Sequence, residues 1–273
     1  MKDSRRLFIK KLGISGAAIT VAPLIPLKAL ASERNNKESS ISIDTNVCQM
    51  SSEEMSGPYF VNDKIIRRNI VEDQEGIPLL LTLKVIDSIT CKPIENILID
   101  IWHCNSFGKY SGWRYINPDL EAPSDNIGTI SRTDSSTFLR GAQKTNSDGF
   151  VRFSTIFPGF YAGRAIHIHV SARKANVDKN KNEKFYFVSQ LYFSEAISNE
   201  VMKNELYSPR EIKRLKNDED SIFSGINNGA AVIFSRKIGS ELEDGIFGSV
   251  TLSIDTSKSS EKIRVSDLFK HTV

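Results

Sequence analysis

Two histidines, His167 and His169, stand one residue apart with Ile168 between them. If this segment forms a β-strand, side chains two positions apart share one face, and their Cα atoms are about 6.6 Å apart. Both imidazoles can then bind one metal ion while Ile168 points into a hydrophobic core. Two half-exposed surface histidines are the alternative interpretation of the same pattern. The residues around the pair therefore help to distinguish a metal site from two surface histidines.

Two tyrosines could supply further ligands. Tyr161 belongs to a loop bounded by Gly159 and Gly163, just before the histidine pair, and glycine allows the backbone to turn back sharply. Tyr110 follows a strand-like segment and precedes a turn at Gly112. The sequence places no cluster of Asp, Glu or Cys beside the histidines, which argues against carboxylate iron sites and Cys-rich zinc sites. A phenolate is a hard, anionic ligand that favours ferric iron, although a single tyrosine is more often a core or rim aromatic.

These residues belong to a longer series of motifs that resembles the intradiol ring-cleavage dioxygenases, the family of catechol and protocatechuate dioxygenases. The resemblance covers roughly residues 48–255 and is strongest to the exported single-domain members of the family. The motifs that carry it are Gly57-Pro58-Tyr59-Phe60, Ile101-Trp102-His103-Cys104-Asn105, Gly108, Tyr110-Ser111-Gly112, Arg140-Gly141-Ala142-Gln143, Thr145, Gly149, Thr155, Pro158-Gly159, Tyr161, Gly163-Arg164, His167-Ile168-His169 and Gln190-Leu191-Tyr192-Phe193.

The resemblance implies a non-haem Fe(III) bound by two tyrosines and two histidines. By motif position, Tyr110 is the phenolate that stays on the metal, and His167 and His169 are the neutral nitrogen ligands. Tyr161 is the phenolate that leaves when substrate arrives, and it can then accept a substrate proton as a general base.

The same resemblance places Arg164 and Gln190 beside the reacting ring, where they would stabilise negative charge and orient the reacting groups by hydrogen bonding. The implied catalytic residues are therefore Arg164, Gln190 and Tyr161. The implied substrates are a small aromatic diol of the catechol type and O₂, and the implied cofactor is Fe(III). Cleavage between the two hydroxyl-bearing carbons gives a muconic-type diacid.

The chain departs from the larger family members in one loop. These members place more residues between the second tyrosine and the first histidine, and they carry helical dimer-forming segments at the N-terminus. Here only five residues separate Tyr161 from His167. The short loop implies a more open site, so bulky or extracellular aromatic substrates become plausible.

Three cysteines in an exported protein allow one disulfide and leave one thiol. We expect the bridge to join Cys91 and Cys104, with three reduced thiols as the alternative. His103 is interpreted as a structural, hydrogen-bonded histidine. Arg140 and Gln143 are expected to support the loop that carries the first ligand tyrosine.

The elements that must position these residues are short strands separated by turn signals. Helical patterns are limited to residues 194–206 and 208–217, a charged insertion between strands. We therefore expect an all-β fold, an antiparallel β-sandwich with a small helical insertion. The expected strands are residues 79–87, 97–103, 149–154, 165–172, 185–193, 230–235 and 248–254.

The composition agrees with one globular domain. The 273 residues are 40% hydrophobic and 25% charged, which excludes disordered, collagen-like and coiled-coil classes, and no repeat of 20–50 residues is visible. Six of the 36 basic residues and one of the 33 acids fall in residues 1–31, so the remaining chain carries a charge near −2. A nucleic-acid partner is therefore not indicated.

Residues 1–31 have the pattern of an export signal. A basic start is followed by an apolar stretch over 12–27 and by small residues at 29–31, and the segment from Ser4 to Lys10 resembles a twin-arginine signal. Pro23 and Pro26 argue against the alternative, an uncleaved membrane anchor. We predict a twin-arginine-type signal peptide over 1–31, a flexible lead over 32–46 and a dioxygenase-like domain over 47–273, located in the periplasm or outside the cell, with no membrane span after processing.

Two other classes of function remain open from the sequence. A non-catalytic β-sandwich that binds or adheres is one, because sandwiches of this size often serve that purpose. A protein that holds a metal ion without turnover is the other. The quartet Tyr110, Tyr161, His167 and His169 distinguishes an enzyme from the first. Colour distinguishes it from the second, because Tyr-to-Fe(III) charge transfer should make the purified protein burgundy and catechol should shift the absorption band.

Overall fold

The computed structural model describes residues 49–63, 65–120, 131–175, 184–208, 210–226 and 229–263. The signal peptide predicted over 1–31 and the lead predicted over 32–46 lie outside these ranges. All described residues belong to one compact unit. Within the described ranges, no helix combines the length and the hydrophobicity needed to span a bilayer.

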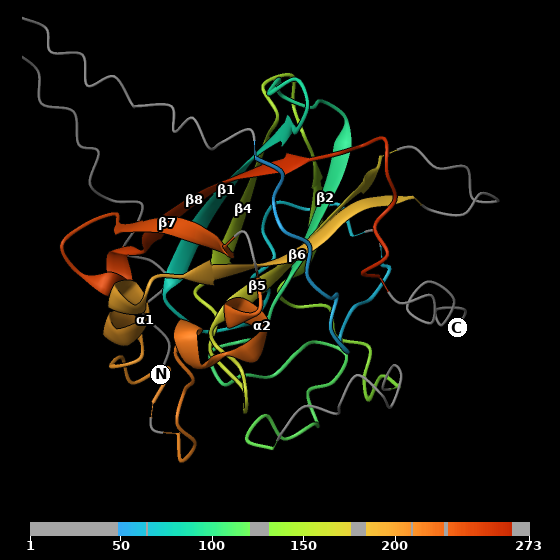
Figure 1. Ribbon diagram of the computed structural model, residues 1–273. Helices are drawn as coiled ribbons and strands as arrows, with labels where there is room; N and C mark the ends of the chain where they lie inside the picture. Colours follow the sequence, from blue (N-terminus) through green and yellow to red (C-terminus); the bar gives the residue numbers. More distant parts are fainter. Residues whose placement is uncertain are drawn as a thin grey trace, which may run out of the picture. The chain divides into compact units, whose positions relative to one another are not determined.

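Eight strands form one mixed sheet, and two short helices lie between β6 and β7 along the chain (Figure 1). The spatial order of the strands is β3-β2-β5-β6-β7-β8-β1-β4. The strands and helices are β1 (Pro78–Asp87), β2 (Ile97–Trp102), β3 (Arg140–Lys144), β4 (Phe150–Ile156), β5 (His167–Lys174), β6 (Phe185–Phe193), α1 (Glu195–Val201), α2 (Ser221–Ser224), β7 (Ala231–Lys237) and β8 (Ile246–Ile254).

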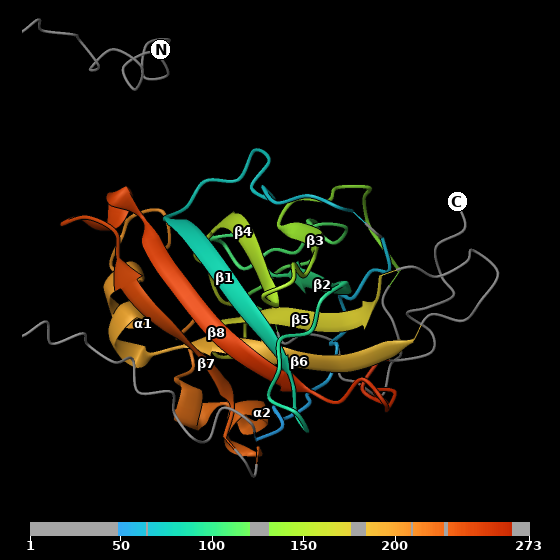
Figure 2. The same cartoon turned by 90° about the horizontal axis from the view of Figure 1, so that it is seen from above.

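The sheet folds over on itself and encloses a hydrophobic core. In β1, alternate side chains from Leu79 to Val85 are fully buried, as expected for a strand with one face on the core. In the core they join buried side chains of β2, β4, β5, β6 and β8. Figure 2 shows β1 and β8 running side by side and crossing over β5 and β6. The strands are therefore hydrophobic because they line a common interior.

Strand β7 connects the two halves of the sheet. Its first residues pair with β6 from Ala231 to Ile233, and its last residues pair with β8 from Phe234 to Lys237. The all-β prediction is correct, but the expectation of a purely antiparallel sandwich is wrong, because β1 with β8 and β6 with β7 are parallel pairs. Parallel strands need a long crossover connection. Residues 194–230, with α1 and α2, connect β6 to β7, and most of the described chain lies between β1 and β8; periodicity along the chain does not reveal how such connections pair the strands.

Seven of the eight strands were predicted. β6 has the predicted bounds, and the other six have shifted ends. Strand β3 was not predicted. The helix predicted over 194–206 is shorter in the structure, where α1 ends at Val201. The helix predicted over 208–217 is wrong, because the described residues before Asn217 form no helix and a 3₁₀ turn follows at Asn217–Glu219. In that segment Arg214 bonds to Glu195 of α1 instead of supporting a local helix.

The predicted disulfide between Cys91 and Cys104 is wrong. Cys91 is disulfide-bonded, whereas Cys104 is a free and buried cysteine. Cys91 lies in the turn before β2 and Cys104 lies just beyond its other end. A six-residue strand is about 20 Å long, and a disulfide requires Cα atoms less than about 7 Å apart. Burial also raises the pKa of the Cys104 thiol to about 12, which makes it unreactive.

Candidate active site

The histidine pair lies at the start of β5, and the Nε2 atoms of the two rings lie close together. His167 and His169 are 2% and 1% exposed, which excludes the alternative of two surface histidines. Ile168 between them is fully buried in the main core, on the opposite face of the strand. His167 Nε2 lies 3.1 Å from His169 Nε2. His167 Nδ1 donates to the Ala165 carbonyl at 2.8 Å, so its Nε2 presents a lone pair towards the same point.

The two tyrosines reach this point from separate loops. The Tyr161 hydroxyl lies 3.2 Å from His167 Nε2. The Tyr110 ring lies against the rings of Tyr161 and His169, with centroid distances of 5.8 and 6.1 Å. The Tyr110 hydroxyl is buried and has no hydrogen-bond partner among the described residues. The structure thus brings together all four residues that the sequence singled out as ligands.

These four residues fit a metal ion. A buried hydroxyl without a partner costs about 1–3 kcal/mol, and a bound cation would remove that cost for Tyr110. Two ligand atoms at right angles, each about 2.1 Å from an ion, are about 3 Å apart, which matches the separation of the two imidazole nitrogens. Among the described residues, no group of three or more His, Cys, Asp or Glu side chains could hold a metal ion, so the oxygen donors beside the histidines are phenols.

The protonation states of the quartet follow from burial. Burial, with the nearby Arg164 charge, lowers the pKa of His167 to about 3, and burial holds the pKa of His169 well below its usual value. Burial raises the pKa of Tyr110 and Tyr161, and Arg164 partly opposes this for both. In the absence of a cation, the imidazoles are neutral and the phenols keep their protons. Binding of a cation would favour the phenolates.

Glycines set the distance between the two tyrosine loops. Gly108 has φ +83°, and a Cβ there would lie 2.1 Å from the Phe160 carbonyl oxygen. A Cβ on Gly159 would lie 2.3 Å from the Ser106 carbonyl oxygen. The loop before Tyr110 and the loop before Tyr161 therefore pack backbone against backbone, which only glycine permits.

Arg164 lies beside Tyr161 in a network of hydrogen bonds. Its Nε pairs with Asp220 Oδ2 at 2.9 Å, and its Nη2 donates to Gln190 Oε1 at 2.6 Å. Its Nη1 faces the Tyr161 hydroxyl at 3.5 Å and its Nη2 faces the Tyr192 hydroxyl at 3.3 Å. The structure therefore brings Arg164 and Gln190 into contact with each other and places the Arg164 guanidinium beside the Tyr161 hydroxyl.

Two buried acids, Asp220 and Glu54, also belong to this network. Asp220 also accepts hydrogen bonds from the backbone of Ala165 and of Ile222 at the start of α2. Burial raises its pKa, but Arg164 and these N–H groups outweigh burial and hold it below the usual value. Glu54 is 4% exposed and accepts from Tyr192 Oη at 2.7 Å. Burial raises its pKa to about 7, although the Tyr192 and Arg164 contacts lower it. Isolated acids of this kind leave no recognisable motif in a sequence.

Two of the three further residues expected to have structural roles, His103 and Arg140, make the expected contacts, and Gln143 does not. His103 is buried, donates from Nδ1 to the Cys104 carbonyl and accepts at Nε2 from the Thr155 hydroxyl, as expected for a structural histidine. Arg140 donates twice to Ser111, the neighbour of Tyr110, and so supports that loop. Gln143 instead bonds to the Ala142 carbonyl within β3, so its support of the loop is not seen.

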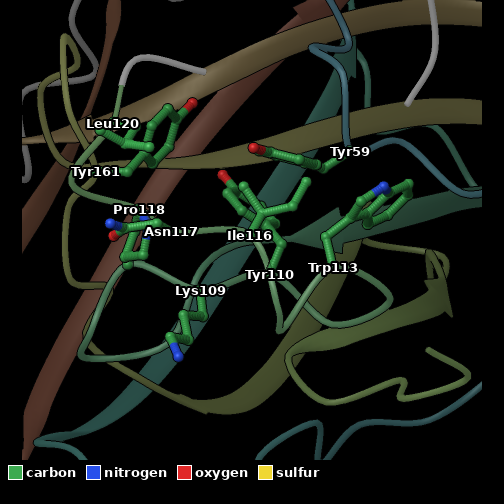
Figure 3. Close-up of a pocket in the computed structure, with 10 residues that line it drawn as sticks. Tyr59, Lys109, Tyr110, Trp113, Ile116, Asn117, Pro118, Leu120 and Tyr161 are labelled. Atoms are coloured by element: carbon green, nitrogen blue, oxygen red, sulfur yellow. The ribbon is translucent and has the colours of Figure 1, made fainter. Parts of the chain in front are cut away.

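A pocket opens beside the two tyrosines (Figure 3). It holds about 260 Å³ of space, open solvent included, and is lined mainly by aromatic and apolar side chains. Tyr59 stacks on Tyr110 with ring centroids 4.6 Å apart and forms part of the wall with Trp113. In Figure 3 the Lys109 side chain points away from the tyrosine rings. The lining suits a flat aromatic molecule.

Comparisons with known proteins show which family the chain resembles. A protein-family model described as dioxygenase matches residues 55–215. The crystal structure of an intradiol ring-cleavage dioxygenase from Tetranychus urticae has a TM-score of 0.69 and 34% sequence identity, and the match covers 79% of this chain and 99% of that one.

Two curated proteins named chlorocatechol 1,2-dioxygenase, from Cupriavidus pinatubonensis and Burkholderia cepacia, are each 29% identical over 109 residues. These matches cover 38% of this chain and 35% of each relative, so the similarity spans about a third of the curated proteins. The family match over more than half of the chain and the likeness to the Tetranychus urticae dioxygenase over nearly its whole length identify the protein as a member of the intradiol ring-cleavage dioxygenase family.

Proposed function

We propose that the protein is a ferric-iron dioxygenase that cleaves the ring of a catechol between its two hydroxyl-bearing carbons. Both atoms of O₂ enter the product, a muconic-type diacid, so no external reductant is needed. The observation that carries the proposal is the convergence of four neutral donors, with the two imidazole nitrogens 3.1 Å apart and the Tyr161 hydroxyl 3.2 Å from one of them.

Tyr110, Tyr161, His167 and His169 would hold the ion. When bound, Fe(III) supplies the Lewis acidity that favours a deprotonated catechol. Every other requirement of the reaction falls to side chains of the chain itself.

Tyr161 is suited to receive a proton from the substrate. Its hydroxyl oxygen lies near the histidine nitrogens and near the Arg164 guanidinium, and its ring lines the pocket. Burial raises the pKa of Tyr161, and a phenolate with a high pKa is a strong base once it is released. The side chain borders the pocket, where the substrate would bind.

Arg164 and Gln190 are suited to bind developing negative charge. The guanidinium is held by Asp220 and Gln190 on the side of Tyr161. A positive group fixed before the reaction needs no reorganisation when charge forms, which is the basis of electrostatic catalysis. The aromatic wall of Tyr59 and Trp113 would hold the flat ring of the substrate.

The preferred experiment is oxygen uptake by iron-loaded protein with catechol, chlorocatechol, protocatechuate, hydroxyquinol and caffeate, with identification of the products. Chlorocatechol is included because the curated relatives carry its name. We expect uptake with at least one of these and a product opened between the two hydroxyl-bearing carbons. Opening beside the diol, or no uptake by folded and iron-loaded protein, would overturn the proposal. A coloured protein without turnover would instead support a metal-binding protein.

We further propose that the protein acts outside the cytoplasm. The paired Arg5 and Arg6, followed by an apolar stretch, support export. A disulfide at Cys91 also supports an oxidising compartment, because such bonds are rare in the cytosol.

A further inference from the structure

Glu54 is a buried carboxyl group that the proposed reaction does not use. It precedes the Gly57 turn, and its Oε2 accepts a hydrogen bond from Tyr192 Oη at 2.7 Å. Its Oε1 lies 3.4 Å from the Ser189 hydroxyl. Burying a carboxyl group is costly, so its place beside the active-site network requires an explanation.

Tyr192 connects Glu54 to Arg164. Its hydroxyl oxygen lies 3.3 Å from Arg164 Nη2 and 3.4 Å from Gln190 Oε1. A hydroxyl has one proton, so a Tyr192 that donates to Glu54 turns its lone pairs towards the guanidinium and accepts from it. Without Glu54, the same proton would turn to Gln190 Oε1 and compete with Arg164 for that oxygen.

Arg164 is consequently held on two sides. Asp220 fixes its Nε edge through the 2.9 Å ion pair. Gln190 and Tyr192 fix Nη2, and this leaves Nη1 directed at the Tyr161 hydroxyl. Loss of the Nη2 contacts with Gln190 and Tyr192 would allow the guanidinium to rotate about its Nε–Cζ bond. Nη1 would then no longer be directed at the Tyr161 hydroxyl.

We propose that Glu54 is a positioning residue that acts through Tyr192 to hold the Arg164–Gln190 pair beside Tyr161. Glu54 lies just outside the residues matched by the family model, which begins at residue 55. The effect on turnover rests on the proposed function, whereas the effect on the Arg164 side chain does not.

The kinetic test compares Glu54→Leu, Glu54→Gln and Glu53→Leu at pH 8 in iron-loaded protein. Glu53 is the matched control, because it is the adjacent acid and its carboxylate accepts from the Val188 backbone instead of from Tyr192. We expect Glu54→Leu to lower kcat/KM about tenfold, mainly through kcat, which corresponds to loss of one hydrogen bond in a charged network. Glu54→Gln keeps an acceptor and is expected to recover most of the activity, and Glu53→Leu to match the wild type.

The variant Tyr192→Phe tests whether Glu54 acts through Tyr192. It removes one oxygen atom and keeps the ring, so it remains informative even if Glu54→Leu fails to fold. If Glu54 acts through Tyr192, the double variant Glu54→Leu/Tyr192→Phe loses no more activity than Tyr192→Phe alone. Independent, multiplicative losses would overturn the proposal, as would a Glu54→Leu enzyme equal to the wild type.

A measurement on metal-free protein separates this inference from the proposed function. The rotation of the Arg164 guanidinium can be followed by nitrogen-15 NMR. We expect faster rotation in Glu54→Leu and in Tyr192→Phe, and no change in Glu53→Leu. Unchanged rotation would refute the positioning role whatever the enzyme does. Faster rotation in a protein that cleaves no catechol would support the positioning role and refute only the proposed function.

Discussion

Tyr161 occupies the point where the metal ligands, Arg164 and the pocket meet. Tyr161→Phe removes the hydroxyl but keeps the buried ring, which is 5% exposed. We expect the variant to fold, to bind iron with an altered visible absorption band, and to turn over about 10²-fold or more slowly, because a general base contributes about that much. Steady-state kinetics and the visible spectrum of iron-loaded protein check this. Wild-type activity would remove Tyr161 from the reaction.

The buried histidines can be divided into ligands and supports. His167→Ala is expected to lose iron and activity together, since His167 Nε2 is one of the four converging donors. His103→Gln is the matched control, because His103 is fully buried but bonded to Cys104 and Thr155. His103→Gln should lower the free energy of unfolding by about 1–3 kcal/mol and leave iron binding unchanged. The iron content of both purified variants tests this. Full iron occupancy in His167→Ala would contradict the role of His167 as a metal ligand.

Glu54 should make the stability of the metal-free protein depend on pH. Its pKa is raised to about 7 in the folded state from 4.5, mainly by burial, so the folded protein holds this proton more tightly than the unfolded chain. The Glu54 contribution therefore lowers the free energy of unfolding as the pH rises from about 4.5 to about 7. Glu54→Gln removes this loss, so its stability relative to the wild type should improve by on the order of 3 kcal/mol across that range. Urea unfolding at pH 4.5 and pH 8 measures it, and a constant difference between the two proteins would count against the assignment.

At the level of single residues, the sequence was informative where a local pattern existed. His167 and His169 have strand spacing, and Arg164 and Gln190 lie within motifs shared with a family. Glu54 and Asp220 have no such pattern, because each reaches Arg164 only through the folding of distant segments. Single acids are usually solvated, so nothing in the sequence sets these two apart.

At the level of elements, the two tyrosine loops depend on each other. Gly108→Ala would place a Cβ 2.1 Å from the Phe160 carbonyl oxygen. Gly229 has a similar φ of +82°, and no atom of the described residues lies within 4 Å of its Cβ position. Both substitutions strain the backbone by about 1–2 kcal/mol. In Gly108→Ala the clash should lower the free energy of unfolding by about 1–3 kcal/mol more. The variant should also bind iron more weakly, because the loop of Tyr161 must shift. Thermal unfolding and iron titration of the pair test this, and equal effects of the two variants would show that the loops adapt.

The elements themselves were predicted unevenly, for physical reasons. β6 is rich in aromatic residues, which favour strands, and its predicted bounds match the structure. β3 was missed because Arg140-Gly141-Ala142-Gln143-Lys144 has a strand glycine and no apolar alternation. The helix expected over 208–217 failed because its charged side chains bond to other segments, as Arg210 does to Asp119.

At the level of the whole molecule, the prediction concerns export. A chain lacking residues 1–31 should fold and bind iron but remain in the cytoplasm. Arg5→Lys/Arg6→Lys in the full chain should also block export, because a twin-arginine signal needs the arginine pair, and Lys2→Arg is a control that keeps it. Cell fractionation with an assay for the folded protein measures this. Secretion of the shortened chain would place the signal elsewhere.

The parallel pairing of β1 with β8 joins the first strand to the last. Until β8 has been synthesised and docked, β1 lacks one of its two hydrogen-bonded neighbours, and the sheet stays open along that edge. Contacts between the ends of a chain form slowly because a large loop must close first. The sheet therefore closes late in folding, and until then the open edge of β1 is a place where strands of other chains could pair and aggregate.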